Sequence, residues 1–322
     1  MYTTSTIALG VSLLASFAYP QKIDKPAVQP NLDYLKDGLQ KNMPSIGHHV
    51  DPWSEDWMPK FCLEQSKSED DGFNPADIKT YNIHYDDCET AWVVCVHKNS
   101  LMKIETLADL FGRVPAGSRS YIRHIISVPA KGGNAWNAGD NIRLNQIGAD
   151  GFEVLLHETG HSLDAHAYDE PLSPSDNWKL KTSRDRAVPD NYAGSSPAED
   201  VAQSTVIAAY NINVPGGFPG IEPRWVEVRN QYETVQTVQR EQAPSILKPG
   251  GRCFKRLENS ETVRVPTGKR LLRGRWAPWR RSQMPDISLA KGLEVIQALD
   301  FDSGKCGEDI ESKAWGPVRQ HS

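Results

Sequence analysis

One short segment of the sequence combines metal-binding and proton-transferring side chains at the spacing that hydrolytic chemistry requires. His157, Glu158 and His161 form an HExxH motif within residues 155–164. Residues four apart lie about 40° from each other around a helix axis, so both imidazoles should face the same side. Two such nitrogens can sit about 2.0–2.1 Å from one Zn²⁺, and Glu158 can reach a water beside the ion. The motif therefore predicts a zinc site of the metallopeptidase type.

A hydrolytic zinc ion also needs a third protein ligand and an open position. The residues that follow the motif offer four candidates: Asp164, His166, Glu199 and Asp200. His166 falls one position short of the third histidine of the metzincin pattern, and the glycine of that pattern is absent. Asp164 is better placed as a hydrogen-bond partner of a ligand imidazole. Glu199 and Asp200 open the next helix, which could pack beside the first.

Glu199 has a structural interpretation as well. Ser196-Pro197-Ala198-Glu199 fits a capping box, with serine at the N-cap and glutamate three residues later. Asp200 would suit the positive end of the helix dipole. Because an HExxH motif precedes this helix, we favour Glu199 as a ligand over Glu199 as a cap.

The residues around this helix resemble a known group of peptidases. HETGHSLD at 157–164, then Tyr192, then Glu199 in EDVAQ, look like the gluzincin pattern of the anthrax lethal factor-like family. That pattern has HExGHxxD and a tyrosine seven residues before a glutamate in an ExxAE segment. By this resemblance Glu199 is the third ligand, and Tyr192 stabilises the tetrahedral transition state. Gln203 departs from the pattern, which usually has glutamate there.

This resemblance covers about residues 120–212, and it implies both a fold and an activity. The implied fold is α+β, a zincin-like core with a small mixed sheet, an active-site helix and a following ligand helix. The implied function is that of a secreted zinc metalloendopeptidase, which hydrolyses peptide or protein substrates with a metal-activated water. Glu158 would then act as general base and later as general acid.

A longer pattern resembles a second family. SPxEDVAQ around Glu199, DCxxxWxxC around Cys88 and Cys95, and an N-terminal signal are similar to the fungal secreted family of conidiation-specific protein 13. That resemblance implies no settled activity. It motivates an alternative function, that of a catalytically idle, zinc-containing secreted protein with a developmental or surface-binding role.

Hydrophobic periodicity places these motifs on a mixed set of elements. We expect strands at 91–96, 120–128 and 141–144, and helices at 149–166, 196–210 and 224–242, with a long loop at 169–196. The apolar run near the N-terminus predicts a signal peptide over 1–18. We further expect an irregular or pro-like arm at 19–60, a catalytic domain at 61–244 and an irregular, disulfide-containing extension at 245–322.

Composition and cysteines fit a secreted, folded protein. A net charge of −5 gives no reason to expect a nucleic-acid partner, and no stretch reaches membrane-spanning length. Five cysteines leave at least one thiol free or paired between chains. Cys253 and Cys306 are natural partners for each other, and Cys88 could bridge Cys95 locally.

Two further features carry weaker interpretations. The basic segment Arg273–Arg281, with Trp276 and Trp279, could bind a cell wall or another anionic surface, although a solvated basic face is commoner. The histidines outside the motif show no ligand spacing, and we expect them on the surface or in the core: His48, His49, His84, His97 and His124.

Overall fold

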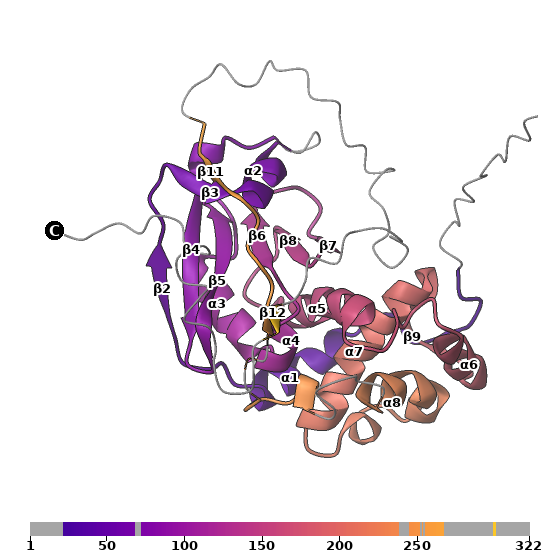
Figure 1. Cartoon of the computed structure of the whole chain (residues 1–322). Coiled ribbons are helices and arrows are strands. Elements are labelled where there is room, and N and C mark those ends of the chain that lie inside the picture. The colour runs from indigo at the N-terminus through magenta and orange to yellow at the C-terminus, as the bar shows by residue number, and fades with distance from the viewer. Residues whose placement is uncertain are drawn as a thin grey trace, which may run out of the picture.

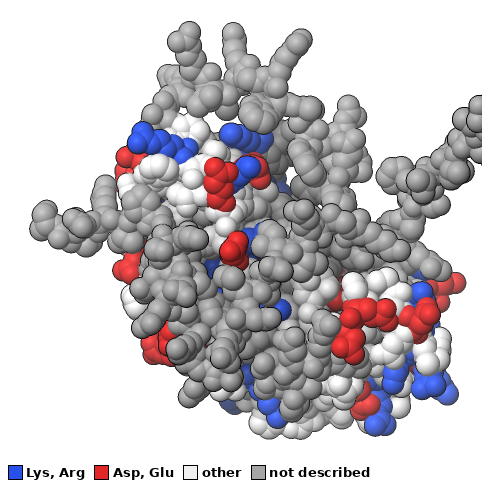
Figure 2. Space-filling model, viewed as in Figure 1, with Lys and Arg blue, Asp and Glu red and all other residues white. Residues whose placement is uncertain are grey.

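The computed structural model describes residues 22–67, 72–237, 245–266 without 252 and 254, and 299–300. The expected signal peptide at 1–18, the basic segment Arg273–Arg281 and Cys306 lie outside these residues. On the described part of the face shown in Figure 2, acidic and basic side chains lie beside one another, as suits a small net charge.

A six-stranded mixed sheet forms one side of the molecule (Figure 1), in the order β2-β4-β5-β6-β8-β7. Neighbours β5–β6 and β6–β8 are parallel, and the other three pairs are antiparallel. The central strands carry nearly unbroken buried runs, which is typical of strands covered on both faces. The bounds are β2 His48–Pro52, β4 Ile78–Tyr85, β5 Cys88–His97, β6 His124–Val128, β7 Ala135–Ala138 and β8 Asn141–Asn145.

Eight α-helices, six short 3-10 helices and three short strand pairs complete the regular structure of the described residues. Helices α6, α7 and α8 gather on the side of α5 away from the sheet (Figure 1). The helices are α1 Lys36–Asn42, α2 Lys60–Ser66, α3 Ile104–Arg113, α4 Ala116–Arg119, α5 Phe152–His166, α6 Asp176–Arg184, α7 Pro197–Asn213 and α8 Arg229–Thr237. The pairs are β1 Ala27–Gln29 with β9 Val188–Asp190, β3 Trp57–Pro59 with β11 Thr262–Arg264, and β10 Lys255–Arg256 with β12 Leu299–Asp300.

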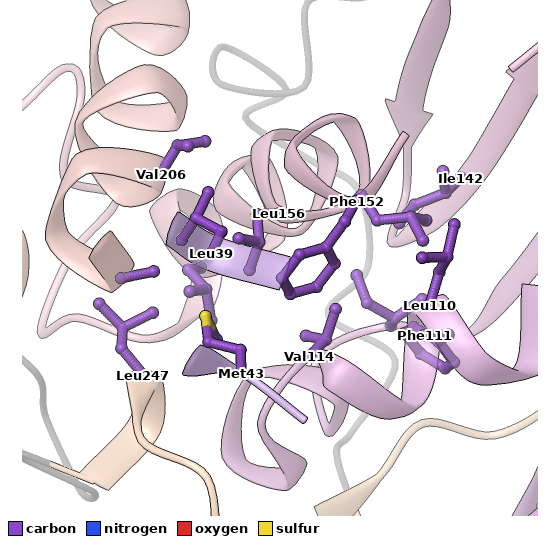
Figure 3. Packing of buried hydrophobic residues seen from close by; sticks show 14 of the residues in the cluster. Leu39, Met43, Leu110, Phe111, Val114, Ile142, Phe152, Leu156, Val206 and Leu247 are labelled. Atoms are coloured by element: carbon purple, nitrogen blue, oxygen red, sulfur yellow. The ribbon is translucent and has the colours of Figure 1, made fainter. Parts of the chain in front are cut away.

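The main hydrophobic core holds α5 in place between the sheet and the other helices. Figure 3 shows Phe152 and Leu156 of α5 among side chains of α1 and α3, with Val206 of α7 nearby. A smaller cluster fills the opposite face of the sheet, beneath α2 and β3, with Phe61 and Ile126 among its members. Burial of this kind stabilises the fold by about 25 cal/mol per Å² of apolar surface.

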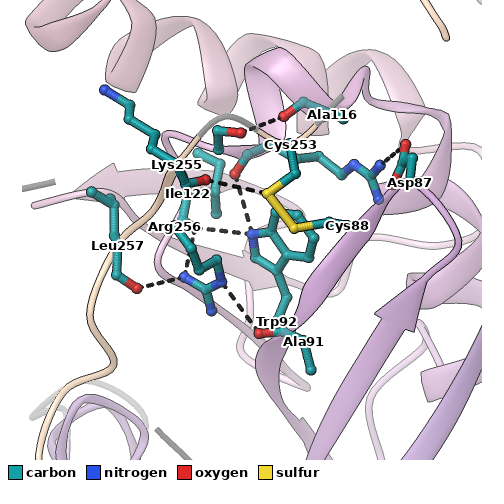
Figure 4. Close-up of a disulfide and its surroundings, with 12 residues drawn as sticks. Asp87, Cys88, Ala91, Trp92, Ala116, Ile122, Cys253, Lys255, Arg256 and Leu257 are labelled. Atoms are coloured by element: carbon teal, nitrogen blue, oxygen red, sulfur yellow. Dashed lines mark hydrogen bonds and ion pairs between the residues drawn. A yellow bond between two sulfur atoms is a disulfide. The ribbon is translucent and has the colours of Figure 1, made fainter. Parts of the chain in front are cut away.

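Two disulfides connect strand β5 to other segments, one to α2 and one to the chain near Cys253, and both pairings differ from the expected ones. Cys62 bonds Cys95, and Cys88 bonds Cys253 (Figure 4). The prediction of a Cys253–Cys306 bridge is therefore wrong. A local Cys88–Cys95 bridge is also excluded, because the two residues share strand β5, where seven residues span about 23 Å.

The described segment at 245–266 crosses the sheet. Polar contacts anchor it there, in addition to the Cys88–Cys253 disulfide. His124 is fully buried, its Nδ1 donates to the Val93 carbonyl at 3.0 Å, and its Nε2 accepts from the Ser260 backbone N–H at 2.9 Å. Burial lowers the pKa of His124 to about 3, opposed by the Val93 hydrogen bond and reinforced by the positive charges of Arg256 and Arg123. The ring is thus neutral, in the one tautomer that satisfies both partners.

Two expectations about segments change. The arm at 19–60 was expected to be irregular or pro-like, but its described residues, 22–60, contribute β1, α1, β2 and β3 to the fold. The expected loop at 169–196 contains α6, which is capped by the Ser175 hydroxyl, and then β9.

Among the described helices, none combines the length and apolarity needed to cross a bilayer.

Candidate metal centre

Helices α5 and α7 approach each other closely at Gly160, the fourth residue of the HExxH motif. A Cβ atom on Gly160 would lie 2.9 Å from the Ala202 Cα and 3.2 Å from the Ala202 carbonyl oxygen. Ordinary carbon–carbon contacts are about 3.5–4.0 Å, so only glycine permits this crossing. The close approach brings the first turn of α7, with Glu199, to the face of α5 that carries both motif histidines.

Three ligand-type atoms converge where the helices cross. Glu199 Oε2 lies 3.1 Å from His157 Nε2 and 3.4 Å from His161 Nε2. Around a tetrahedral zinc ion, with ligand bonds near 2.1 Å, neighbouring ligand atoms are about 3.4 Å apart. All three atoms lie within 4.8 Å of one another, so the group could hold a metal ion. Burial alone would raise the pKa of Glu199, but the adjacent imidazoles of His157 and His161 hold it well below its ordinary value.

Ser196 caps α7, but Glu199 does not complete the capping box. The Ser196 hydroxyl accepts a hydrogen bond from the Glu199 backbone N–H at 3.2 Å. The Glu199 carboxylate instead points to the two imidazoles. The serine therefore fixes the helix start, and the glutamate side chain is left for the site.

The other nitrogen of His157 is held by two further residues. His157 Nδ1 donates to Gln203 Oε1 at 3.0 Å, and Gln203 Nε2 donates to Asp190 Oδ2 at 2.6 Å. Asp190 Oδ1 accepts from the Ala193 backbone N–H at 2.8 Å. Because Asp190 accepts from the amide nitrogen, the amide oxygen must face His157. This fixes both the Gln203 amide and the tautomer that leaves Nε2 able to bind a metal.

Glu158 is buried beside the three converging atoms. Burial raises the pKa of its carboxyl to about 7, opposed by His157 and reinforced by Glu199. Among the described residues, no hydrogen-bond donor reaches its Oε2. Asn137 of edge strand β7 donates to the Glu158 carbonyl at 2.7 Å and to Ser162 Oγ at 2.8 Å. Because its pKa is raised to about 7, the Glu158 carboxyl can take up and release a proton near neutral pH.

Tyr192 lies beside His157 and is about half exposed to solvent. Its ring centroid is 5.5 Å from that of His157. Burial raises its pKa, as do the carboxylates of Glu199 and Glu158, so the hydroxyl stays protonated and able to donate. All five residues predicted from sequence are thus adjacent to one another.

The other three candidate ligands are not among the atoms that converge here. His166 Nε2 is 3.2 Å from Asp140 Oδ1, one turn beyond the motif. Asp164 accepts from the Ser173 backbone N–H at 2.7 Å. Asp200 is fully buried, with the Thr182 hydroxyl near its Oδ2.

Sequence reasoning did not find Asp190 or Asn137. Asp190 follows a proline on a three-residue strand, which carries no motif. Asn137 stands in what reads as a turn, between two glycine-containing segments. Only their contacts across the fold identify them.

The chain belongs to the family of conidiation-specific protein Con-13, whose profile matches residues 30–243. It is 30% identical over 181 residues to conidiation-specific protein 13 of Neurospora crassa. The matched part covers 55% of this chain and 53% of that relative, so the chain spans about half the length of the curated relative it matches. No solved structure matches the chain.

Proposed function

We propose that this protein is a secreted zinc metalloendopeptidase with a zincin-like core of the lethal factor-like kind. The proposal depends on one observation above all. Glu199 on α7 places Oε2 at 3.1 and 3.4 Å from the Nε2 atoms of His157 and His161 on α5. A carboxylate from a second helix meeting an HExxH pair is the ligand set of a gluzincin.

The surroundings of this group support the same interpretation. The sheet is mixed, and its edge strand β7 is tied to the motif helix through Asn137. The helix that carries the third ligand follows in the chain and crosses at Gly160. The two disulfides are compatible with an oxidising, extracellular setting.

Each residue then has a role that its position allows. A bound Zn²⁺ supplies a Lewis acid that polarises the substrate carbonyl and lowers the pKa of a water toward 7. His157, His161 and Glu199 would hold the ion, and Gln203 would orient His157. Glu158 takes the proton of the attacking water and passes it to the leaving amine. The Tyr192 hydroxyl donates a hydrogen bond to the developing oxyanion.

The test compares the secreted, untagged protein with its Glu158→Gln variant on a peptide library, with cleavage read by mass spectrometry. Wild type should cleave, and the variant should bind the same amount of zinc while losing at least about 10²-fold in rate, as general-base removal does. Glu170→Gln is the matched control, because Glu170 is exposed beyond the end of α5. Cleavage that is equal in all three proteins comes from a contaminant and removes the enzyme proposal.

A second outcome would favour the alternative role. If wild type binds zinc through His157, His161 and Glu199 but cleaves nothing in the library, the site is structural. The observation that motivates this alternative is Gln203, which stands where the peptidase pattern has a carboxylate. The protein would then be a zinc-containing secreted protein with a developmental or surface-binding role.

A further inference from the structure

A second group of ligand-type side chains lies on strands β2 and β4, at the edge of the sheet opposite β7 (Figure 1). In the antiparallel pairing of these strands, His49 stands directly opposite His84. Asp51 is two residues beyond His49, so its side chain emerges on the same face of the sheet. Strand pairing thus joins three residues whose positions in the sequence show no ligand spacing.

The three side chains converge in space. Asp51 Oδ2 lies 3.2 Å from His84 Nε2 and 3.8 Å from His49 Nε2. The two imidazole rings stack at a centroid distance of 4.3 Å with planes 5° apart. The three ligand atoms all lie within 4.8 Å of one another, as do those of the group at α5 and α7. Ligand atoms about 3.4 Å apart suit a tetrahedral ion, so small side-chain rotations complete the geometry.

We propose that His49, Asp51 and His84 form a second binding site for a divalent transition-metal ion. Two imidazoles and one carboxylate suit Zn²⁺, Ni²⁺ or Cu²⁺, whereas Ca²⁺ and Mg²⁺ require oxygen ligands throughout. The backbone of paired strands fixes the relative positions of the ligands before any ion binds. Little ordering cost therefore opposes binding, even at the surface.

The site is open to solution, unlike the one between α5 and α7. The His49 side chain is 67% exposed and that of Asp51 is 44% exposed, while His84 is mostly covered. An ion bound here keeps at least one position for water or for a ligand from another molecule. This arrangement suits an exchangeable surface ion, whose binding does not depend on the peptidase proposal.

The experiment measures Zn²⁺ binding by untagged, full-length protein that has been stripped with a chelator. Equilibrium dialysis against buffered Zn²⁺ at pH 7.5, with metal analysis, gives the stoichiometry and the affinity of each class of site. Wild type should bind two ions per chain. His49→Ala and His84→Ala should each lose one ion, or weaken it by at least about tenfold, given that loss of even an outer ligand partner costs 10–100-fold.

The matched control is His48→Ala. His48 neighbours His49 but lies on the opposite face of β2, where its ring contacts Tyr85. This variant should bind as wild type does, and His161→Ala should lose the other ion only. His49→Ala carries little risk of unfolding, since His49 is exposed.

These variants separate the two proposals. One ion in wild type that disappears in His84→Ala supports the surface site while removing the site at α5 and α7. Retention of the wild-type number and affinity of ions in both His49→Ala and His84→Ala overturns the surface site.

Discussion

Replacing Gln203 by glutamate would introduce the residue usual in the lethal factor-like pattern, yet the structure predicts a less stable protein. The Gln203 amide donates to Asp190 Oδ2 at 2.6 Å and accepts from His157 Nδ1 at 3.0 Å. In Gln203→Glu the donor becomes a second buried carboxylate facing Asp190. Loss of a hydrogen bond to a charged acceptor costs about 1.5–3 kcal/mol. Two carboxylates about 4 Å apart add up to about 4 kcal/mol of repulsion at intermediate dielectric.

We therefore expect Gln203→Glu to lower the free energy of unfolding by about 3–5 kcal/mol at pH 8. The deficit should shrink as the pH falls. The repulsion raises the pKa of this carboxyl pair in the native state above that in the unfolded chain, so the native state binds a proton more tightly. Once one carboxyl keeps its proton, it can donate to the other.

The double variant Asp190→Asn with Gln203→Glu exchanges the donor and the acceptor. The new amide at 190 can donate to the new carboxylate, and its oxygen can still accept from the Ala193 N–H. Stability should return to within about 1 kcal/mol of wild type, as paired replacements of hydrogen-bond partners allow. The assay is urea unfolding of metal-free protein with disulfides intact, followed by tryptophan fluorescence. Equal stability of wild type and Gln203→Glu at pH 8 would refute the reasoning.

Three further predictions concern single residues. Gly160→Ala places a methyl group 2.9 Å from the Ala202 Cα, so α7 must move away from α5. Because Glu199 moves with α7, zinc binding should weaken at least about tenfold in a competition titration. Its overpacking cost of about 1–3 kcal/mol should exceed the gain in helix propensity of about 1 kcal/mol, so thermal unfolding should occur at a lower temperature. Because the pKa of His124 is lowered to about 3 in the native state, the unfolded chain binds the extra proton. His124 alone should therefore lower the free energy of unfolding by about 3 kcal/mol between pH 7 and 4.5, and His124→Gln should remove this contribution, as measured by urea titrations of both proteins at both pH values. Tyr192→Phe should reduce the rate of peptide cleavage about 10²-fold with unchanged zinc affinity, as loss of one oxyanion donor does; an unchanged rate would remove its role.

The sequence indicated the helix of the HExxH motif and the helix of Glu199 because both carry local signals. Helix α5 was expected at 149–166 and begins at Phe152. Ser196-Pro197 marks the start of α7 in the sequence prediction and in the structure. Polar helix α6 was missed because its buried side chains, Trp178 and Thr182, give too little apolar periodicity.

Contacts across the fold were beyond reach of the sequence. The Cys88–Cys253 bridge spans 165 residues, and nothing local distinguishes it from other pairings. His49 and His84 come together through the register of two strands, which spacing along the chain does not reveal. The hydrogen bond from Gln203 to Asp190 likewise depends on β9 packing against α7.

We propose above all that one zinc ion is held between α5 and α7. Crystals grown with zinc and measured on both sides of the zinc absorption edge test it most directly. We predict an anomalous peak about 2.1 Å from His157 Nε2, His161 Nε2 and Glu199 Oε2, absent in Glu199→Ala. Fully zinc-loaded crystals with no peak among these three atoms, and the imidazoles paired to the carboxylate by hydrogen bonds alone, would contradict the account.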